Sequence, residues 1–285
     1  MVKPPPVEPV PPEGVMLVAA DLEQPRCFSF LGGEVVAFTR PCPGVDGRTN
    51  EDACAILPWD GKSGVLVVAD GVGGLPAGGD AARITIRAIR DALTAGRRDE
   101  IELRDAVLRG IDEGNRKVLA DGRGAATTVA VAQIRGRRVR SIHVGDSGVV
   151  ITGQRGRVKL MTVFHSPVGY AMEAGLLDEE EAIQHEERHL VSNLVGTEDM
   201  RIELGSAIEL AARDTVLVAS DGLFDNFLPT EIVEKVRKGG LATVAGTLAR
   251  EVHGRMEKEV AGQPSKPDDL SFLLFRPIAA AAPSA

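Results

Sequence analysis

Acidic residues stand at the ends of several apolar segments of this sequence. Asp70 directly follows the run Val65 to Ala69, and a cluster of glycines comes after it. Further acids lie at comparable places, at Asp146, Asp221, Asp268 and Asp269, and a polar loop carries Glu51 and Asp52. If these segment ends lie along one edge of the fold, the carboxylates converge. Two unit charges about 4 Å apart repel by roughly 4 kcal/mol even at an effective dielectric constant near 20, so such a cluster requires cations.

Hard divalent cations suit this set of ligands. Carboxylate oxygens without clustered histidine or cysteine favour magnesium or manganese over zinc. Paired hard cations typically serve phosphoryl chemistry, because they lower the pKa of a bridging water and neutralise charge on the phosphate. Arg48, beside the acidic loop, could clamp a phosphate through its planar fork of donors. Each acid alone is more simply explained as a turn or cap residue; their joint occurrence favours the metal site.

The apolar patterns predict the elements that would hold these residues. Strands are expected at residues 34–39, 53–57, 65–69, 127–134, 139–144, 149–152, 207–210, 215–219 and 270–275. Helical spacing is found over residues 82–93, 103–118 and 241–256. Because the strand connections are mostly hairpin-like and the helices are long, the pattern favours antiparallel sheets covered by helices. The acidic stretch 165–196 is expected to lie over the sheet as an insertion.

The composition is that of an ordinary globular protein. With 285 residues, 44% of them hydrophobic, the chain can form a sizeable core. A formal net charge of -8 argues against nucleic acid as a partner. Cys27, Cys42 and Cys54 indicate neither a disulfide framework nor a cysteine zinc site, which fits a cytoplasmic protein. No apolar stretch is long enough to cross a membrane and no signal peptide is recognisable, so no membrane association is expected.

The domain boundaries follow from the ends of the chain. Residues 1–25 are proline-rich and are expected to be a flexible tail, and residues 278–285 a second one. Residues 26–277 would form one globular domain.

Six short segments, in this order, resemble the motifs of a known family. They are RTNEDA (48–53), VVADGVGG (67–74), ATT (126–128), VGDSG (144–148), VASDGLFDN (218–226) and PDDLS (267–271). Together they are similar to the metal-dependent Ser/Thr protein phosphatases of the PPM or type 2C family, in its bacterial form. The resemblance covers about residues 46–276, nearly the whole globular part.

The resemblance implies a fold and a set of residue roles. The fold would be an α+β, four-layer α-β-β-α sandwich of two antiparallel sheets, with a flap at about residues 165–196. Asp70 would bridge two Mn²⁺ or Mg²⁺ ions, the Gly71 carbonyl would bind one of them, and Asp221 and Asp268 would complete the pair. Glu51 and Asp52 would bind or orient metal waters. An optional third ion would use Asp146 together with Asp221, and Arg48 would bind the phosphate.

The implied reaction is hydrolysis of phosphoserine and phosphothreonine in proteins by direct attack of a metal-bridging hydroxide. The substrates would be phosphorylated proteins, with a cognate Ser/Thr kinase as the opposing enzyme, and the protein is expected to be a monomer.

The chain also departs from the usual family pattern at several positions. Arg48 lies three residues before the glutamate rather than four, and Val72 stands where many eukaryotic members have a histidine general acid. Gly148 replaces a common arginine, Phe164 a common aspartate, and Asp269 a common asparagine. None of these changes removes an expected metal ligand.

Two other functions are compatible with parts of the sequence. A haloacid-dehalogenase-type phosphatase also places a nucleophilic aspartate after an apolar strand, but it needs a second acid where this chain has Val72. A non-catalytic binding module of the same fold would explain the departures, yet the intact acidic set argues against it.

Overall fold

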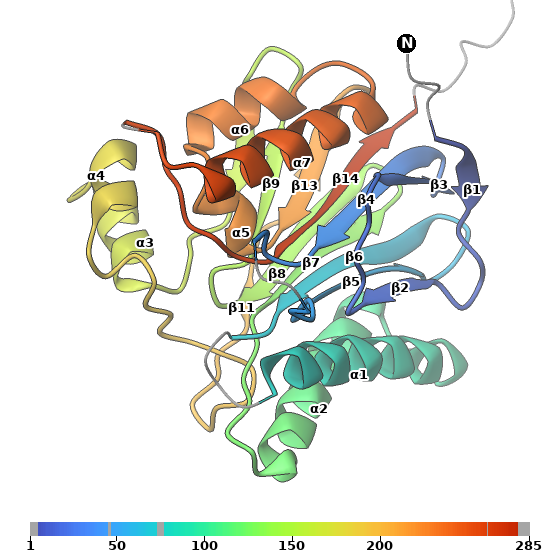
Figure 1. Cartoon of the computed structure of the whole chain (residues 1–285). Helices are drawn as coiled ribbons and strands as arrows, with labels where there is room; N and C mark the ends of the chain where they lie inside the picture. Colours follow the sequence, from blue (N-terminus) through green and yellow to red (C-terminus); the bar gives the residue numbers. More distant parts are fainter. Residues whose placement is uncertain (1–4, 45–46, 73–76, 261, 279–285) are drawn as a thin grey trace, which may run out of the picture.

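Two β-sheets lie face to face in the computed structural model, and helices cover both outer faces (Figure 1). The structure describes residues 5–44, 47–72, 77–260 and 262–278. The first sheet has the order β1 (Val7–Pro9), β3 (Arg26–Phe30), β4 (Gly33–Arg40), β14 (Leu270–Pro277), β13 (Thr215–Ala219), β9 (Gly148–Thr152) and β10 (Val158–Met161). All of its neighbouring strands are antiparallel except β1 and β3, which are parallel.

The second sheet is antiparallel throughout the described pairs. Its order is β11 (Glu203–Leu204), β8 (Arg138–Val144), β7 (Val129–Arg135), β6 (Ser63–Asp70), β5 (Asp52–Pro58) and β2 (Val15–Val18), and β12 (Ile208–Glu209) also pairs with β8. Helices α1 (Gly78–Arg98) and α2 (Leu103–Asp121) cover this sheet, whereas α6 (Pro229–Val236) and α7 (Leu241–Glu257) cover the first sheet (Figure 1). The predicted four-layer α+β fold is therefore confirmed.

Strand β6 shows why the sequences of the central strands are continuous apolar runs. Leu66 and Val68 point into the core between the two sheets, while Val65, Val67 and Ala69 pack toward α1 and α2. Both faces of the strand are buried, so the alternation of polar and apolar residues that marks a half-exposed strand is absent. The same apolar run that predicts this strand thus fixes where Asp70 emerges from it.

The flap lies at one end of the sandwich, next to the start of α6, where the Thr230 hydroxyl donates a hydrogen bond to Glu179 at 3.0 Å (Figure 1). It contains α3 (Pro167–Glu173) and α4 (Glu179–Gln184), and a further short helix, α5 (Asp221–Phe224), follows β13 (Figure 1). Ser166 caps α3 by accepting a hydrogen bond from the Gly169 amide, and Asp178 forms a capping box with Glu181 at the start of α4.

The N-terminal segment differs from the predicted flexible tail. Strand β1 pairs with β3, and β2 pairs with β5, so residues 7–9 and 15–18 extend the two sheets. Proline is tolerated in β1 because this strand lies at a sheet edge, where a missing N–H donor leaves no ladder bond broken. The second predicted tail falls almost entirely outside the described residues, as do Gly73 and Gly74 of the glycine cluster.

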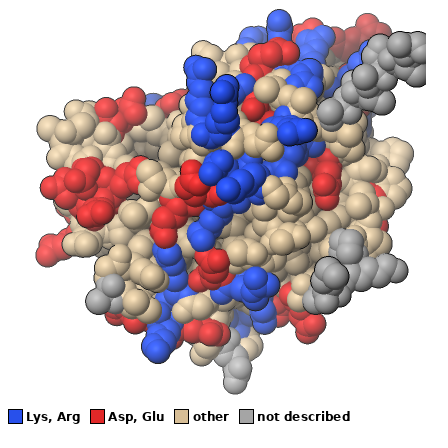
Figure 2. Space-filling model, turned by 90° about the horizontal axis from the view of Figure 1, so that it is seen from above, with Lys and Arg blue, Asp and Glu red and all other residues tan. Residues whose placement is uncertain are grey.

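The surface over α6 and α7 carries a band of lysine and arginine side chains interleaved with acids (Figure 2). Several of these cations form ion pairs, namely Lys235 with Glu251, Arg237 with Glu234 and Arg255 with Glu231. Their charge is therefore balanced locally. Among the described residues, no helix combines the length and apolar character needed to cross a membrane.

Candidate active site and metal centre

The strand register brings the predicted acids to one edge of the sandwich. Asp52 at the start of β5 lies opposite Asp70 at the end of β6. In the other sheet, the end of β13 lies opposite the start of β14, because Ala219 pairs with Phe272. Asp221 and Asp268 flank these two strand ends. Residues far apart in the sequence therefore meet because each terminates a strand at the same edge.

A buried hydrogen bond joins the two sheets at this edge. The Ser220 hydroxyl donates to Oδ2 of Asp52 at 2.8 Å, and the amide of Ser271 donates to the same hydroxyl at 3.1 Å. Asp52 is only 1% exposed, and its Oδ1 has no hydrogen-bond partner among the described residues. Burial, followed by the charge of Asp269, raises the pKa of Asp52 well above its ordinary value.

The backbone of Asp70 is fixed by the two threonines of the ATT motif. The Thr127 hydroxyl donates to the Asp70 carbonyl oxygen at 2.7 Å, and the Asp70 amide donates to the Thr128 hydroxyl at 3.2 Å. The Thr128 hydroxyl also lies 2.6 Å from that of Ser147, next to Asp146. The motif's threonines thus tie two of the acid-bearing turns together, a role that the sequence alone does not reveal.

Gly71 is required by the close approach of helix α1. A Cβ at residue 71 would lie 2.3 Å from the carbonyl carbon of Gly78, which is backbone and cannot move aside. The absence of a side chain lets the chain turn tightly after Asp70. Coordination of an ion by the Gly71 carbonyl stays a prediction.

Asp70 and Asp221 face each other closely enough to share a hydrogen bond when one of them is protonated. Burial and then the charge of Asp221 raise the pKa of Asp70 well above its ordinary value. Burial also acts to raise the pKa of Asp221, but Lys266 and the hydrogen bonds from Asp70 and Lys266 outweigh it and lower that pKa. No donor of the described part of the chain reaches Oδ1 of Asp221.

Lys266 and Asp225 belong to this cluster although sequence reasoning did not select them. The Lys266 ammonium donates to Oδ2 of Asp221 and to Oδ2 of Asp225, both at 2.6 Å, and lies 3.4 Å from Oδ2 of Asp268. Burial lowers the pKa of Lys266, but the surrounding carboxylates outweigh it and hold that pKa above its ordinary range. The one signal in the sequence was the spacing of Asp225, four residues after Asp221.

The other two acids near Lys266 also titrate abnormally. Burial and then the charge of Asp221 raise the pKa of Asp268 to about 7 and that of Asp225 to about 6. Asp146 is nearly buried, and burial followed by the charges of Asp221 and Asp225 raises its pKa well above the ordinary value. Each of these raised pKa values indicates that the carboxylates lie close together and that the nearby positive charge does not compensate their repulsion.

Asp269 organises the loops that lead to the site. Its Oδ1 accepts a hydrogen bond from the backbone amide of Cys42, and its Oδ2 accepts one from the backbone amide of Glu51, both at 2.7 Å. Arg48 approaches the same carboxylate, with Nε 3.5 Å from Oδ1 of Asp269 and Nη2 3.9 Å from Oδ1 of Asp268. Burial and then Asp269 raise the pKa of Glu51. The structure therefore brings Arg48 and Glu51 to the rim of the acidic cluster.

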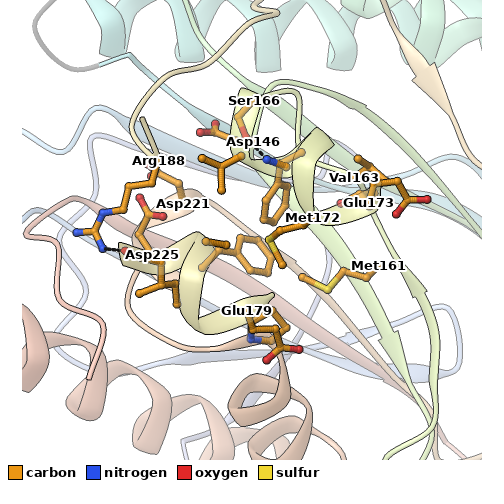
Figure 3. Close-up of a pocket in the computed structure, with 18 residues that line it drawn as sticks. Asp146, Met161, Val163, Ser166, Met172, Glu173, Glu179, Arg188, Asp221 and Asp225 are labelled. Carbon is orange, nitrogen blue, oxygen red and sulfur yellow. Dashed lines mark hydrogen bonds between the residues drawn. The ribbon is translucent and has the colours of Figure 1, made fainter. Parts of the chain in front are cut away.

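A cavity of about 250 Å³ opens between the flap and the acids. Figure 3 shows Asp146, Asp221 and Asp225 on one side of it and Met161 and Met172 on the other. Phe164, Val168 and Phe224 add to its apolar lining. The cavity is thus acidic at the side of the candidate metal centre, while its flap side combines apolar residues with Glu173, Glu179 and Arg188 (Figure 3).

His165 anchors the base of the flap. Its Nδ1 accepts hydrogen bonds from the Gly145 amide at 3.1 Å and from Nδ2 of Asn193 at 2.8 Å, while its Nε2 lies 3.2 Å from Glu203. The ring also stacks on His143, with centroids 4.5 Å apart. His143, His165 and Glu203 are close enough to hold a metal ion. However, Nδ1 of His165 accepts hydrogen bonds, so Nε2 carries the proton, donates to Glu203 and has no lone pair for a metal ion.

The acidic edge has the properties of a site for divalent cations. Oδ1 of Asp52 and Oδ1 of Asp221 meet no hydrogen-bond donor of the described residues, and several neighbouring carboxyl pKa values are raised. Oxygen-only donors of this kind suit Mg²⁺ or Mn²⁺. Asp70, Asp221 and Asp268 therefore fit the predicted pair of ions, and Asp52 lies opposite Asp70, where it could orient water.

Comparisons with known proteins relate this chain to protein phosphatases. A profile of the family described as Protein phosphatase 2C matches residues 45–259. The serine/threonine phosphatase stp of Listeria innocua is 27% identical over 198 residues, which is 66% of this chain and 77% of its own length. Stp1 from Staphylococcus aureus has a TM-score of 0.74 at 25% identity, over 92% of this chain and 99% of its own.

A further solved structure resembles the fold. The catalytic domain of PstP, solved in complex with 2 manganese ions, has a TM-score of 0.62 at 23% identity over 86% of this chain and 99% of its own. On the profile match and the similarity to named phosphatases, the chain belongs to the protein phosphatase 2C family of serine/threonine phosphatases.

Proposed function

We propose that the acidic edge binds two Mn²⁺ or Mg²⁺ ions and that the protein uses them to hydrolyse phosphoserine and phosphothreonine in other proteins. The observation that carries this proposal is the meeting of Asp52, Asp70, Asp221 and Asp268 at one edge, where an oxygen of Asp52 and one of Asp221 meet no donor of the described residues. Asp70 would hold both ions, and Asp221 and Asp268 one or the other. When bound, the ions would lower the pKa of a water and neutralise charge on the phosphate.

Arg48 is our candidate for binding the phosphoryl oxygens. Its side chain is 31% exposed, and Asp269 approaches it from the Nε side. The guanidinium thereby combines a fixed position with donors that still reach solvent. A planar fork of donors suits a phosphate dianion. Glu51 and Asp52 would orient water at the ions, with Asp52 held by the Ser220 hydroxyl.

Protonation of the leaving group needs a source other than residue 72. Val72 has no titratable proton, so the position that carries a histidine in many eukaryotic relatives supplies no general acid here. Water or another group would protonate the serine or threonine oxygen as it leaves.

The flap cavity would accept part of the substrate protein. Its acidic side is continuous with the proposed metal ligands Asp146 and Asp221, so a phosphorylated residue at the acids brings its chain neighbours against Met172 and Val168. The apolar lining favours an apolar side chain next to the phosphorylated residue. The cavity would therefore contribute to the choice among phosphoproteins.

The partners and location also belong to the proposal. A Ser/Thr kinase would produce the substrates, and the enzyme would act as a monomer in the cytoplasm. All three cysteines are buried free thiols, which is compatible with a reducing compartment. The intact acidic set and the family membership favour an enzyme over a non-catalytic binding module.

Hydrolysis of a phosphothreonine peptide tests this function. We expect phosphate release in the presence of Mn²⁺ or Mg²⁺, loss of turnover on addition of a chelator, and recovery when the metal is restored. A phosphotyrosine peptide of the same sequence serves as the control substrate and should be hydrolysed more slowly. Turnover that persists in chelator would contradict the metal dependence, and a trapped phosphoenzyme would contradict direct attack by water.

A further inference from the structure

The Lys266 ammonium lies inside the cluster of predicted metal ligands. It forms two hydrogen bonds of 2.6 Å, to Asp221 and to Asp225, and approaches Asp268 at 3.4 Å. A lysine at this place is a cation that the chain itself supplies, and its three donors match three carboxylate partners.

The two oxygens of Asp221 have different surroundings. Oδ2 accepts the hydrogen bond from Lys266, whereas Oδ1 is buried and meets no donor of the described residues. Oδ1 is thus available to the two divalent ions proposed to bind at Asp70. Oδ2 already interacts with the positive charge of the Lys266 ammonium.

The backbone around Lys266 holds the side chain in this position. The Lys266 amide donates to Oδ1 of Asn226 at 2.9 Å, and Nδ2 of Asn226 donates to the Lys266 carbonyl oxygen at 2.9 Å. Asn226 is fully buried and also donates to the Gly222 carbonyl oxygen, one residue after Asp221. The same asparagine therefore fixes both the lysine and the turn that carries its carboxylate partner.

We propose that Lys266 takes the third cation position of this site, so that the protein binds two divalent ions and no third. The inference rests on the proposed function, because it presupposes that two divalent ions bind at Asp70, Asp221 and Asp268. A third ion at Asp146 and Asp221 would have to share Asp221 with the Lys266 ammonium, and two positive charges on one carboxylate repel each other strongly inside a protein site. The expected third ion and the observed lysine therefore exclude each other.

Counting bound Mn²⁺ tests this inference without any assay of activity. The number of ions per chain is measured by electron paramagnetic resonance of free Mn²⁺ during a titration of the folded, full-length protein. The variants are Lys266→Met, which removes the charge, and Lys266→Arg, which keeps it. Lys238→Met, at an exposed lysine that follows α6, is the matched control.

We expect two ions for the wild type, the Lys266→Arg variant and the Lys238→Met control, and a third, weaker ion for Lys266→Met. Three ions bound to the wild type would overturn the inference and leave the proposed function intact. Equal numbers for the wild type and a folded Lys266→Met would overturn it as well. Fewer than two ions on the wild type would contradict the proposed function itself. If Lys266→Met does not fold, the wild-type and Lys266→Arg counts still decide the question.

Discussion

The ring of Phe164 fills the space that a side chain at Gly148 would need: a Cβ at residue 148 would lie 2.5 Å from Cε1 of Phe164. The ring also packs on Phe224, with centroids 4.9 Å apart. These are two of the positions where the chain departs from its relatives, since an arginine and an aspartate are common there. The structure connects the two departures, because the aromatic ring occupies space that only glycine leaves open.

Gly148→Ala is therefore expected to destabilise the protein. Overpacking of a buried site costs about 1–3 kcal/mol, which urea unfolding would detect. Gly246→Ala in α7 is the control, because a Cβ there meets no atom within 4 Å and alanine favours the helix by roughly 0.5–1 kcal/mol. Equal stability of Gly148→Ala and the wild type would contradict the packing described here.

Asp269→Asn tests a carboxylate that has no assigned role in the family pattern. Each of its oxygens accepts one backbone amide, whereas an asparagine has a single acceptor and would turn N–H groups toward the other amide. Leaving one buried donor unpaired costs about 1–3 kcal/mol. We expect that loss in urea unfolding in the presence of chelator, and no comparable loss for the exposed Asp112→Asn. A stable Asp269→Asn would show that the two loops are held by other contacts.

Met172→Glu tests the proposed contact between the flap cavity and the substrate. A charge in the apolar wall should raise KM by about tenfold for a phosphothreonine peptide with an apolar neighbour, the size of one lost apolar contact. For a small aryl phosphate, which does not reach the flap, KM should change little. Leu176→Glu, on the same flap but 75% exposed, is the control. Equal effects on the two substrates would argue against a peptide-binding cavity.

The raised pKa values predict how pH acts on the metal-free protein. Burial and the charge of Asp221 raise the pKa of Asp268 from 3.8 to about 7, so the folded state binds more protons than the unfolded chain between these values. The free energy of unfolding therefore falls as pH rises through this window. Because other groups titrate too, the wild type is compared with Asp268→Asn in chelator. We expect the wild type to lose more stability between about pH 5 and about pH 8; parallel curves would contradict the shift.

The sequence was sufficient to predict the strands that carry the acids. Their apolar runs are buried on both faces, as in β6, so a local pattern identifies both the strand and the residue at its end. The strands β1 and β2 were not predicted, because proline-rich composition indicates an extended chain and their pairing depends on the edges offered by β3 and β5.

The contacts that complete the site depend on tertiary packing. Lys266 stands in a polar loop, where a lysine is normally solvated, and only the position of Asn226 turns it toward Asp221. Asp269 was noted as a departure, but its two amide partners come from a loop more than two hundred residues earlier in the chain. No local pattern encodes such contacts.

The most direct test of the central claim is the rate of phosphopeptide hydrolysis by Asp70→Asn at saturating Mn²⁺. The carboxylate of Asp70 is proposed to hold both ions, so its loss should lower kcat by about 100-fold or more, the effect of removing a key electrostatic group from an active site. Asp112→Asn, an exposed acid on α2, should retain wild-type turnover. An Asp70→Asn variant that keeps kcat within a few-fold of the wild type would contradict the assignment of this acidic edge as the phosphatase centre.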